Sequence, residues 1–352
     1  MNYYIFVIGC QQNYYDADKI AHLLNQMGYF ESDEKNADLI IVLGCSVRKK
    51  PVDKIFSKVE NWKKLPQNPK VIITGCMLPI DKKKFKDRVD AIIDVKEIET
   101  ELPKLLNIKL EIRNLKLEIG NKSNSFIPIM YGCDNFCTYC AVPYTRGREV
   151  SRNVDEILDE IKSMIKNGIN KITLLGQNVN SYKSSKHLNI KTSKQKNDFV
   201  ELLKKIEKIE GLKEIYFLTA HPKDMSDGLI EWMKNSKKFS KELHLPLQSG
   251  DDEILKKMNR HYTSGDFIKL VAKIRKATKL KFFSTDIIVG FPTETEKQFK
   301  NTFDICKQIG FDKAFVSQFS SRAGTPAAKM KDDVSSIEKK KRWKIINDLI
   351  NK

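Results

Sequence analysis

The chain has 352 residues, of which 41% are hydrophobic, and a formal net charge of +18. This length and composition predict a globular protein with two domains or one large α/β domain, and they exclude a disordered chain. The excess of 63 lysine and arginine residues over 45 aspartate and glutamate residues favours a polyanionic partner such as nucleic acid, although lysines on solvated helix faces explain part of it.

Cysteine content and the start of the chain indicate the cellular compartment. Seven cysteines are too few for a disulfide scaffold in a chain of this size. The first residues have neither the basic start nor the apolar run of a signal peptide, and no apolar run approaches the roughly 18 residues of a membrane span. We therefore expect a soluble cytoplasmic protein that needs no membrane and acts as a monomer.

Short apolar strands alternate with helical patterns in the first hundred residues. Strands are expected at 3–8, 38–43, 71–74 and 91–95, and helices at 16–27, 51–64 and 99–106. Three of these strands are followed by a Gly-Cys pair, which places Cys10, Cys45 and Cys76 at equivalent positions. Because ligands collect at the carboxyl ends of parallel strands, we expect these three thiols to form a metal site at one sheet edge.

A polar segment at 109–124 has poor periodicity, and we place a domain boundary there, between domains 1–115 and 116–352. Beyond it, strands are expected at 171–175, 214–218, 242–247, 281–289 and 313–319, with helices between them. With the apolar segment 126–131 this gives six strands, too few for a closed eight-unit barrel of about 250 residues. The predicted fold class is therefore α/β, a parallel N-terminal α/β domain followed by a partial (β/α)6 barrel.

Two basic segments lie in the second domain. The stretch 182–198 is polar and rich in lysine, and we expect a mobile surface loop. A basic amphipathic helix is expected at 334–349, packed through residues that include Ile337, Trp343 and Ile346. Its basic residues, Lys339 and Arg342 among them, are expected on a solvated outer face that could approach phosphates.

The boundary segment is followed by three cysteines, Cys133, Cys137 and Cys140, with the spacing C-x3-C-x2-C. Thiolates are the ordinary ligands of iron–sulfur clusters and of zinc, and closed structural sites take four protein ligands. Three thiolates therefore suggest a metal centre with an open position for a substrate or cofactor. Zinc with a fourth ligand from elsewhere in the chain is the alternative, and the spacing alone leaves both open.

The motif, with Tyr139 before its last cysteine, resembles the radical S-adenosylmethionine (SAM) superfamily. Other segments are similar to its methylthiotransferase branch, and these include Gly9-Cys10-Gln11-x-Asn13, Pro143-Tyr144-Thr145-Arg146-Gly147, Gly176-Gln177-Asn178-Val179-Asn180 and His244-Leu245-Pro246-Leu247-Gln248-Ser249-Gly250. The Gly-Gln-Asn-Val-Asn signature points to the group of tRNA-2-methylthio-N6-dimethylallyladenosine synthases. Members of this family continue into an RNA-binding β-barrel (TRAM) domain, which we expect this chain to lack because it stops at Lys352.

The resemblance implies two [4Fe–4S] clusters and SAM as cofactors. Cys133, Cys137 and Cys140 would hold the cluster that binds SAM, and Cys10, Cys45 and Cys76 would hold an auxiliary cluster that presents sulfur. The resemblance and the strand-end positions assign SAM contacts to six residues, Tyr139, Gly176, Gln177, Asn178, Gln248 and Ser249.

The implied reaction adds a methylthio group at ring position 2 of N6-dimethylallyladenosine, next to the anticodon of tRNA. Expected partners are tRNA, a flavodoxin-like or ferredoxin-like electron donor, and a sulfur source. Two other readings remain open. One is a methylthiotransferase for threonylcarbamoyladenosine in tRNA or for a ribosomal protein, against which Gln177 and Asn178 argue. The other is a non-catalytic RNA-binding protein with two zinc sites, which the missing fourth ligands disfavour.

Several further residues have less specific roles. Arg146, Arg148 and Arg152 are candidates for phosphate contacts or for structural ion pairs. His221 and His244 are expected to be structural or to orient substrate, because hydrogen abstraction by a radical needs no general base. A seventh cysteine, at position 306, has the spacing of a helix core residue.

Overall fold

The computed structural model describes residues 1–46, 49–108, 125–184 and 198–351. The chain divides into two compact units. The first comprises Met1–Phe126 with Tyr144–Arg146 and Lys166–Gly168, and the second comprises Ile127–Pro143, Gly147–Ile165 and Ile169–Lys352. The predicted boundary between residues 115 and 116, and most of the predicted loop at 182–198, lie outside the described residues.

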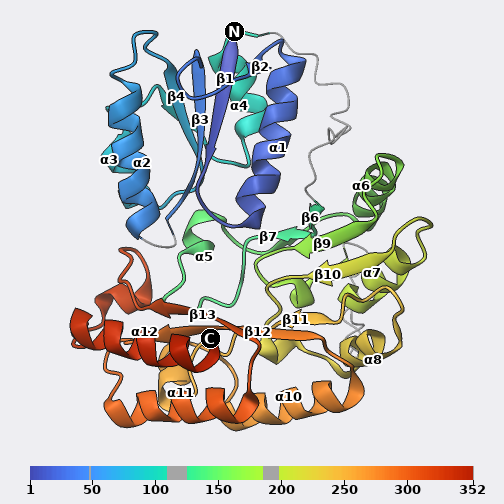
Figure 1. Cartoon of the computed structure of the whole chain (residues 1–352). Helices are drawn as coiled ribbons and strands as arrows, with labels where there is room; N and C mark the ends of the chain where they lie inside the picture. Colours follow the sequence, from blue (N-terminus) through green and yellow to red (C-terminus); the bar gives the residue numbers. More distant parts are fainter. Residues whose placement is uncertain (47–48, 109–124, 185–197, 352) are drawn as a thin grey trace. The chain divides into compact units, whose positions relative to one another are not determined.

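The first unit is built on a five-stranded parallel sheet with the strand order β2-β1-β3-β4-β5. The strands are β1 (Asn2–Val7), β2 (Phe30–Glu31), β3 (Leu39–Cys45), β4 (Lys70–Cys76) and β5 (Ala91–Ile92). The helices are α1 (Gln11–Gln26), α2 (Lys49–Trp62), α3 (Pro79–Phe85) and α4 (Ile98–Leu105). Figure 1 shows α1 and α4 on one face of this sheet and α2 and α3 on the other.

Two apolar cores cover the two faces of the sheet, because successive side chains of a strand point to opposite faces. Strand β3 shows the alternation. Leu39, Ile41 and Leu43 belong to the core that also contains side chains of α1 and α4. Ile40 and Val42 belong to the core that contains side chains of α2 and α3. The continuous apolar run of β3 is thus explained by burial on both faces.

The ends of β3 and β4 approach each other closely at two glycines. Gly44 pairs in register with Gly75, and Cys45 pairs with Cys76 directly after them. Gly75 has a φ of +96°, and a Cβ there would lie 2.6 Å from the carbonyl oxygen of Gly44. Because Cβ atoms do not approach backbone oxygens this closely, glycine is needed at position 75 to keep the two cysteines side by side.

Six strands of the second unit form its two larger sheets. In chain order they are β6 (Phe126–Pro128), β9 (Lys171–Leu175), β10 (Glu214–Phe217), β11 (Glu242–His244), β12 (Phe282–Val289) and β13 (Lys313–Gln318). Two sheets, β10-β9-β6 and β11-β12-β13, are joined by a parallel bridge between Ile215 of β10 and Phe239. The strands form a partial barrel, which confirms the predicted α/β class.

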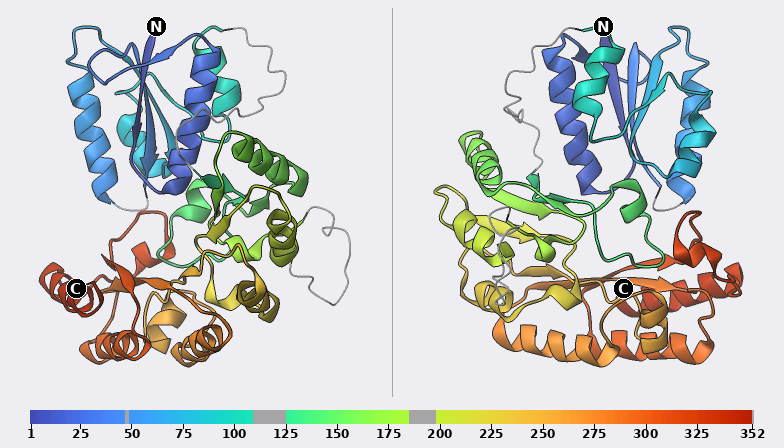
Figure 2. Two further views of the ribbon diagram at one scale, coloured as in Figure 1. Left: turned by 45° about the vertical axis from the view of Figure 1, so that its right-hand side comes forward. Right: turned by 180° about the vertical axis from the view of Figure 1, so that it is seen from behind.

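Helices connect these strands and lie on the outer side of the strand arc (Figure 2). They are α6 (Val154–Lys166), α7 (Asp198–Glu207), α8 (Asp227–Asn235), α9 (Asp252–Lys257), α10 (Ser264–Ala277) and α11 (Glu296–Ile309), and α12 (Ser336–Ile350) follows β13. The short helix α5 (Val142–Thr145) lies in the loop that follows Cys140. Single turns of 3-10 helix occur at η1 (Val179–Ser181), η3 (Pro222–Asp224) and η4 (Pro326–Lys329). Capping boxes, formed by Thr263 with Asp266 and by Thr295 with Gln298, begin α10 and α11.

The start of α1 differs from the prediction. The helix begins at Gln11, not at residue 16, and Cys10 is its N-cap residue. The apolar spacing that predicts the helix only starts at Ile20, whereas Gln12 and Asn13 of the first turn are buried polar residues that the apolar pattern does not reveal. Cys10 therefore lies at a helix start three residues beyond β1, while Cys45 and Cys76 are true strand ends.

Helix α12 buries different side chains from those predicted. Ile337, expected to pack, is 81% exposed. Lys339 and Arg342, expected on a solvated face, are buried. Lys339 forms an ion pair with Asp332, and Arg342 donates to Glu294 at 2.9 Å. The prediction of a fully solvated basic face is therefore wrong, because nearby carboxylates compensate two of its charges and allow their long stems to pack.

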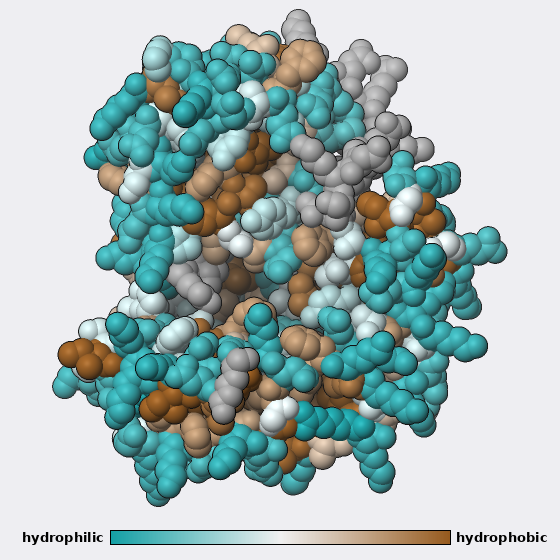
Figure 3. Space-filling model, in the orientation of Figure 1, coloured by the Kyte–Doolittle hydropathy of each residue, from teal (hydrophilic) through white to brown (hydrophobic). Residues whose placement is uncertain are grey.

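The surface is mainly polar on the face that Figure 3 shows, with apolar residues in smaller patches. In the part of the chain that the structure describes, no helix is long and apolar enough to cross a membrane. Exposed large apolar side chains, such as Phe30 and Ile337, come from separate elements of the fold.

Replacing Gly75 by alanine is expected to destabilise the first unit by about 2–4 kcal/mol, because the new methyl group meets the Gly44 backbone at a positive φ. Gly28→Ala is the matched control, since Gly28 has a φ of +80° but no atom within 4 Å of its Cβ position. Gly28→Ala should lower the free energy of unfolding by about 1 kcal/mol. Native-state hydrogen exchange of β3 and β4 peptides measures both, and equal losses would contradict the steric argument.

Candidate metal centres

Three cysteines of the first unit lie at one edge of its sheet. Cys45 and Cys76 end neighbouring strands and pair in register. Cys10 precedes α1, and its Sγ lies 3.7 Å from Oδ1 of Asn13. The Sγ of Cys76 lies 3.9 Å from the same oxygen. The structure thus brings together the three thiols that the Gly-Cys repeats predict, with Cys10 exposed, Cys45 partly exposed and Cys76 buried.

Asn13 is fully buried at the centre of this edge. Its Nδ2 donates a hydrogen bond to the carbonyl oxygen of Gly44 at 3.0 Å. A Cβ at Gly9 would lie 2.8 Å from the amide of Asn13, and a Cβ at Gly75 would lie 3.3 Å from it. Gly9 and Gly75 therefore leave the space that Asn13 fills, whereas a Cβ at Gly44 would meet the side chain of Met77 at 2.6 Å. Close packing is thus a physical reason for each of the three Gly-Cys pairs.

A buried arginine lies against these thiols. The Nε of Arg146 donates to the Sγ of Cys76 at 2.7 Å, and its Nη2 donates to Oδ2 of Asp16 at 3.0 Å and to Oδ1 of Asn13 at 3.3 Å. Although burial disfavours its charge, Cys76 and Asp16 raise the pKa of Arg146 above the ordinary value. The guanidinium is therefore a permanent positive charge beside a cysteine sulfur.

The donor set of the first unit fits a cluster. Burial raises the pKa of Cys76 to about 12, against the lowering effect of Arg146, so without metal this thiol keeps its proton. Metal binding would displace that proton, because the ligand is the thiolate. Three cysteine sulfurs are one fewer than the four that complete a cubane cluster. Within the described ranges, no group of three His, Cys, Asp or Glu side chains is placed to hold a single metal ion.

The three cysteines of the second unit lie in the loop at 132–149. An antiparallel ribbon of β7 (Met130–Tyr131) and β8 (Val150–Ser151) closes this loop. The backbone nitrogen of Cys133 donates to the carbonyl oxygen of Gly147 at 3.2 Å, and that of Cys140 donates to Cys137 at 2.9 Å. Burial raises the pKa of Cys133, and it raises that of Cys140 to about 12 with a contribution from the neighbouring thiols. The loop therefore gathers three thiols in a low-dielectric setting.

The segment that ends α9 fastens this loop in place. The Nδ2 of Asn259 donates to the carbonyl oxygens of Asn135 at 3.0 Å and Phe136 at 3.1 Å. The backbone nitrogen of Thr138 donates to the carbonyl oxygen of Met258 at 3.1 Å. Phe136 has a φ of +47°, a conformation that is strained for a non-glycine residue and that these bonds hold.

A second buried arginine lies at this loop. The Nη1 of Arg260 donates to the Sγ of Cys137 at 3.5 Å, Nε donates to the hydroxyl of Tyr262 at 3.0 Å, and Nη2 donates to the carbonyl oxygen of Pro246 at 3.2 Å. Burial disfavours its charge, yet Tyr139, Tyr262 and Cys137 raise the pKa of Arg260. Sequence reasoning missed this residue because it lies 123 positions from Cys137 and belongs to no recognised motif.

Five of the residues assigned to SAM lie after strand ends. Gly176, Gln177 and Asn178 follow β9, and Gln248 and Ser249 come shortly after β11. Among the described residues, the amide oxygens of Gln177, Asn178 and Gln248 are buried without a hydrogen-bond partner. Buried acceptors normally have a donor, and the ammonium and ribose hydroxyls of SAM are donors of this kind. The residues present therefore fit such a ligand, and their contact with it stays a prediction.

Ser249, one of these five, and Tyr139, the sixth assigned residue, have protein partners. The hydroxyl of Ser249 is 3.3 Å from that of Thr302, and it accepts from the backbone nitrogen of Asp251 at 3.2 Å. Tyr139 packs against an apolar cluster that contains Phe291. Burial raises the pKa of Tyr139 well above its ordinary value. These contacts give both residues a structural role, and their roles toward SAM stay predictions.

The two histidines are held in structural contacts. The backbone nitrogen of His221 donates to Oδ1 of Asn180 at 2.8 Å, and burial, with a further effect of Arg260, lowers its side-chain pKa to about 2. His244 Nδ1 lies 3.0 Å from the hydroxyl of Ser284. His221 is therefore neutral at physiological pH, which suits an uncharged packing residue and not a general acid.

The three arginines that follow the motif have different surroundings. Arg146 is buried, and Arg152 forms an ion pair with Glu160 at 2.7 Å. Arg148 has a side chain that is 71% exposed, and it pairs with Asp134 at 2.9 Å. Of the three, Arg148 is the one placed at the surface where a phosphate could reach it.

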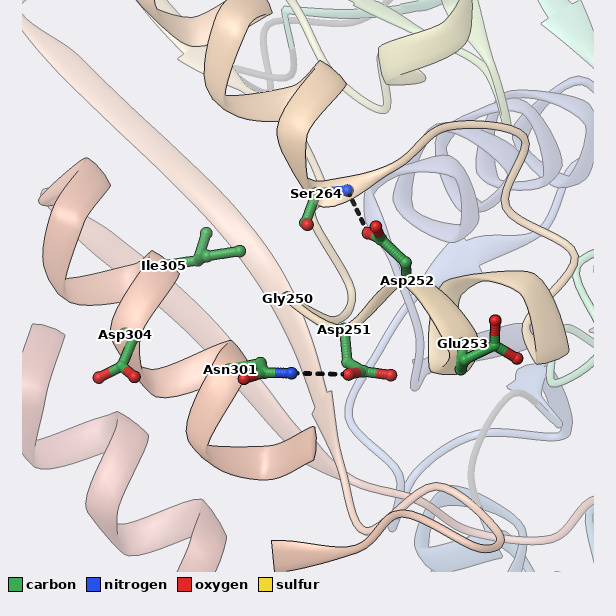
Figure 4. A pocket seen from close by; sticks show the side chains of 8 residues that line it. All are labelled: Gly250, Asp251, Asp252, Glu253, Ser264, Asn301, Asp304 and Ile305. Carbon is green, nitrogen blue, oxygen red and sulfur yellow. Dashed lines mark hydrogen bonds between the residues drawn. The ribbon is translucent and has the colours of Figure 1, made fainter. Parts of the chain in front are cut away.

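A surface pocket of about 310 Å³ lies elsewhere on the second unit, beside α9 and α11 (Figure 4). It is lined by Gly250, Asp251, Asp252, Glu253, Ser264, Asn301, Asp304 and Ile305. Two of its carboxylates already accept hydrogen bonds within the fold. Asp252 accepts from the backbone nitrogen of Ser264 at 2.7 Å, and Asp251 accepts from Nδ2 of Asn301 at 2.8 Å. The pocket contains none of the predicted site residues.

Comparison with known proteins places this chain in a class. A family model described as "Radical SAM superfamily" matches residues 127–306, and one described as "Uncharacterized protein family UPF0004" matches residues 2–94. The solved structure of the radical S-adenosylmethionine methyltransferase TsrM from Kitasatospora setae, with cobalamin and a [4Fe-4S] cluster bound, is similar in fold. Its TM-score is 0.65 at 13% identity, over 93% of this chain and 76% of that chain. The class is thus that of radical SAM proteins.

Closer relatives narrow the class. A tRNA-2-methylthio-N(6)-dimethylallyladenosine synthase from Carboxydothermus hydrogenoformans is 42% identical over 99% of this chain and 83% of its own length. A protein of the same name from Clostridium botulinum is 42% identical over 99% of this chain and 81% of its own length. The chain therefore belongs to the family of the tRNA-2-methylthio-N(6)-dimethylallyladenosine synthases within the radical SAM superfamily.

The low pKa of His221 predicts an acid-sensitive second unit. Below pH 6.5 the unfolded chain binds a proton at this histidine, whereas the folded chain does so only near pH 2. The unfolded state thus binds more protons in this window, and the free energy of unfolding falls as pH falls, by about 2 kcal/mol between pH 8 and pH 5. His221→Gln should remove the part of the pH-dependent fall in unfolding free energy that comes from this histidine.

Urea unfolding at several pH values, followed through Trp232 and Trp343 of the second unit, measures the effect. The difference in unfolding free energy between wild type and His221→Gln should shift by about 2 kcal/mol in favour of the variant from pH 8 to pH 5. A constant difference across this range would show that His221 is not held neutral.

Proposed function

We propose that the protein is a tRNA methylthiotransferase, which adds a methylthio group at ring position 2 of N6-dimethylallyladenosine next to the anticodon. One observation carries the proposal: each of the two units gathers three cysteine thiols, in a chain that is 42% identical to synthases named for this product. The net charge of +18 supports a tRNA substrate, because lysine and arginine bind phosphates and release counterions.

The cofactors in this proposal are two [4Fe–4S] clusters and SAM. Cys133, Cys137 and Cys140 would hold the cluster that binds SAM. The auxiliary cluster would be held by Cys10, Cys45 and Cys76. When bound, these groups supply the radical chemistry, the methyl group and the sulfur. With three protein ligands each, both clusters keep a position open for a non-protein ligand.

The chain's own residues would position SAM and keep water away. The amide oxygens of Gln177, Asn178 and Gln248 are buried acceptors for its ammonium and hydroxyl donors. Gly176 allows Met130 to pack against the backbone here, because a Cβ at this position would lie 2.6 Å from the side chain of Met130. Tyr139 would contribute an aromatic surface for the adenine. Their burial supports a site in which reactive species are shielded from solvent.

The proposal extends to domains and partners. Residues 1–115 would form the auxiliary-cluster domain and residues 116–352 the radical SAM domain. A one-electron donor of the flavodoxin or ferredoxin type and a separate sulfur source would serve the two clusters. The chain would act as a monomer in the cytoplasm. Arg148, the exposed arginine after the cysteine motif, is a candidate contact for tRNA phosphate.

Iron analysis tests the two clusters. Protein purified without oxygen should contain about eight irons per chain, and alanine substitution of either cysteine triple should lower this to about four. Cys306→Ala is the matched control, because Cys306 is a core cysteine with 1% exposure, as predicted, and its loss should leave about eight irons. Colourless protein with stoichiometric zinc would contradict the proposal.

Nucleoside analysis tests the substrate. In a strain that lacks the gene, tRNA should contain N6-dimethylallyladenosine without its 2-methylthio group, and a plasmid copy should restore the group. The Cys133, Cys137 and Cys140 triple variant should cleave no SAM. The Cys10, Cys45 and Cys76 triple variant should still cleave SAM but add no methylthio group. Persistence of the 2-methylthio nucleoside in the strain, without a second gene of this family, would refute the substrate assignment.

A further inference from the structure

Arg146 belongs to the first unit, although its neighbours at 143 and 147 belong to the second. Its side chain is 2% exposed and reaches Cys76 through Nε at 2.7 Å. A short contact of this kind between a guanidinium and a sulfur is a charge-assisted hydrogen bond when the sulfur is a thiolate. The arginine is therefore placed to act on whatever the thiolate of Cys76 ligates.

A buried carboxylate holds this arginine in position. Oδ2 of Asp16 accepts from Nη2 of Arg146 at 3.0 Å, while Oδ1 of Asp16 accepts from Gln12 at 3.4 Å. The side chain of Asp16 is 7% exposed. The guanidinium plane is thus fixed by Asp16 and Asn13 on one side and by Cys76 on the other, and its charge is largely compensated before any metal binds.

One nitrogen of the guanidinium has no protein partner. Among the described residues, Nη1 of Arg146 is buried and makes no hydrogen bond, and neither does Oε1 of Gln12. Buried arginine donors are costly to leave unpaired. The inorganic sulfides of an iron–sulfur cluster are hydrogen-bond acceptors, and a cluster held by the adjacent cysteines would bring such acceptors to this region.

Hydrogen bonds and positive charge at cluster sulfurs set reduction potentials. A donor at a ligating sulfur stabilises the reduced cluster more than the oxidised one, because reduction adds negative charge. Arg146 supplies both the donor and the charge, whereas Asp16 opposes the charge. The two residues should thus move the potential in opposite directions.

Resting on the function proposed above, we propose that Arg146 is a positioning residue of the auxiliary cluster. It donates to the thiolate of Cys76 and, through Nη1, to a sulfur of the cluster, and it raises the reduction potential of that cluster. Asp16 orients the guanidinium and limits the increase in reduction potential that Arg146 causes.

The experiment uses the full chain with Cys133, Cys137 and Cys140 replaced by alanine, so that the auxiliary cluster is the one that remains. About four irons per chain are expected in this parent. Its potential is measured anaerobically by stepwise reduction with dithionite, with the reduced cluster followed by electron paramagnetic resonance. Arg146→Gln should lower the equilibrium constant for reduction at least tenfold, which corresponds to about 59 mV for a one-electron couple.

Asp16→Asn is expected to shift the reduction potential of the auxiliary cluster in the opposite direction. This substitution keeps the shape of the side chain and removes its charge, so the potential should rise relative to the parent. Arg152→Gln is the matched control, because it removes a largely buried, ion-paired arginine of the second unit and should leave the potential unchanged. A general loosening of the fold would not produce shifts of opposite sign in the first two variants.

The outcomes separate the two proposals. A parent without iron would refute the auxiliary cluster and with it the proposed function. A parent with iron whose potential is unchanged by both Arg146→Gln and Asp16→Asn would overturn the role of Arg146 and leave the proposed function intact. If Arg146→Gln retains no iron, the sign of the shift in Asp16→Asn decides: a rise supports the proposal, and a fall or no change overturns it.

Discussion

The close approach of β3 and β4 at Gly44 and Gly75 is the constraint on which the metal-binding edge of the first unit depends. Parallel pairing in register brings Cys45 and Cys76 level with each other, and the missing side chains before them leave a space. Asn13 fills this space and reaches the sulfurs of Cys10 and Cys76. A side chain at Gly75 would displace the backbone of Gly44 or the amide of Asn13, whereas one at Gly44 would meet the side chain of Met77.

Both sets of thiols have a buried arginine, but the charges are compensated differently. Arg146 is paired with Asp16, so the pair brings little net charge to the first edge. Arg260 has no carboxylate within ion-pair distance in the ranges that the structure describes, and it donates to the sulfur of Cys137, the hydroxyl of Tyr262 and the carbonyl oxygen of Pro246. A buried cation with neutral partners favours anions nearby, such as thiolates. Arg260 thus keeps a charge that no carboxylate within ion-pair distance compensates in the described ranges, whereas the charge of Arg146 is paired with Asp16.

Apolar periodicity predicted most strands and helices within a few residues, because burial on one face or on both imposes that pattern. The sequence also predicted both cysteine sets. The C-x3-C-x2-C spacing revealed the set of the second unit, and the repeated Gly-Cys pair revealed the set of the first. What sequence reasoning missed are buried polar and charged groups. Arg260, Lys339 and Arg342 look like surface residues in the sequence, and their partners are known only once distant segments have folded together. A pattern of single residues cannot reveal such pairs.

The place of Arg146 in the chain has a consequence for the order of folding. The sheet of the first unit is complete by residue 92, yet the cation that neutralises its buried Asp16 is synthesised more than fifty residues later. Until that segment emerges and docks, Asp16 of α1 lacks the cation that compensates its charge in the folded unit. Folding of the first unit is therefore completed only after the segment that contains Arg146 has been made, and this segment follows the C-x3-C-x2-C motif.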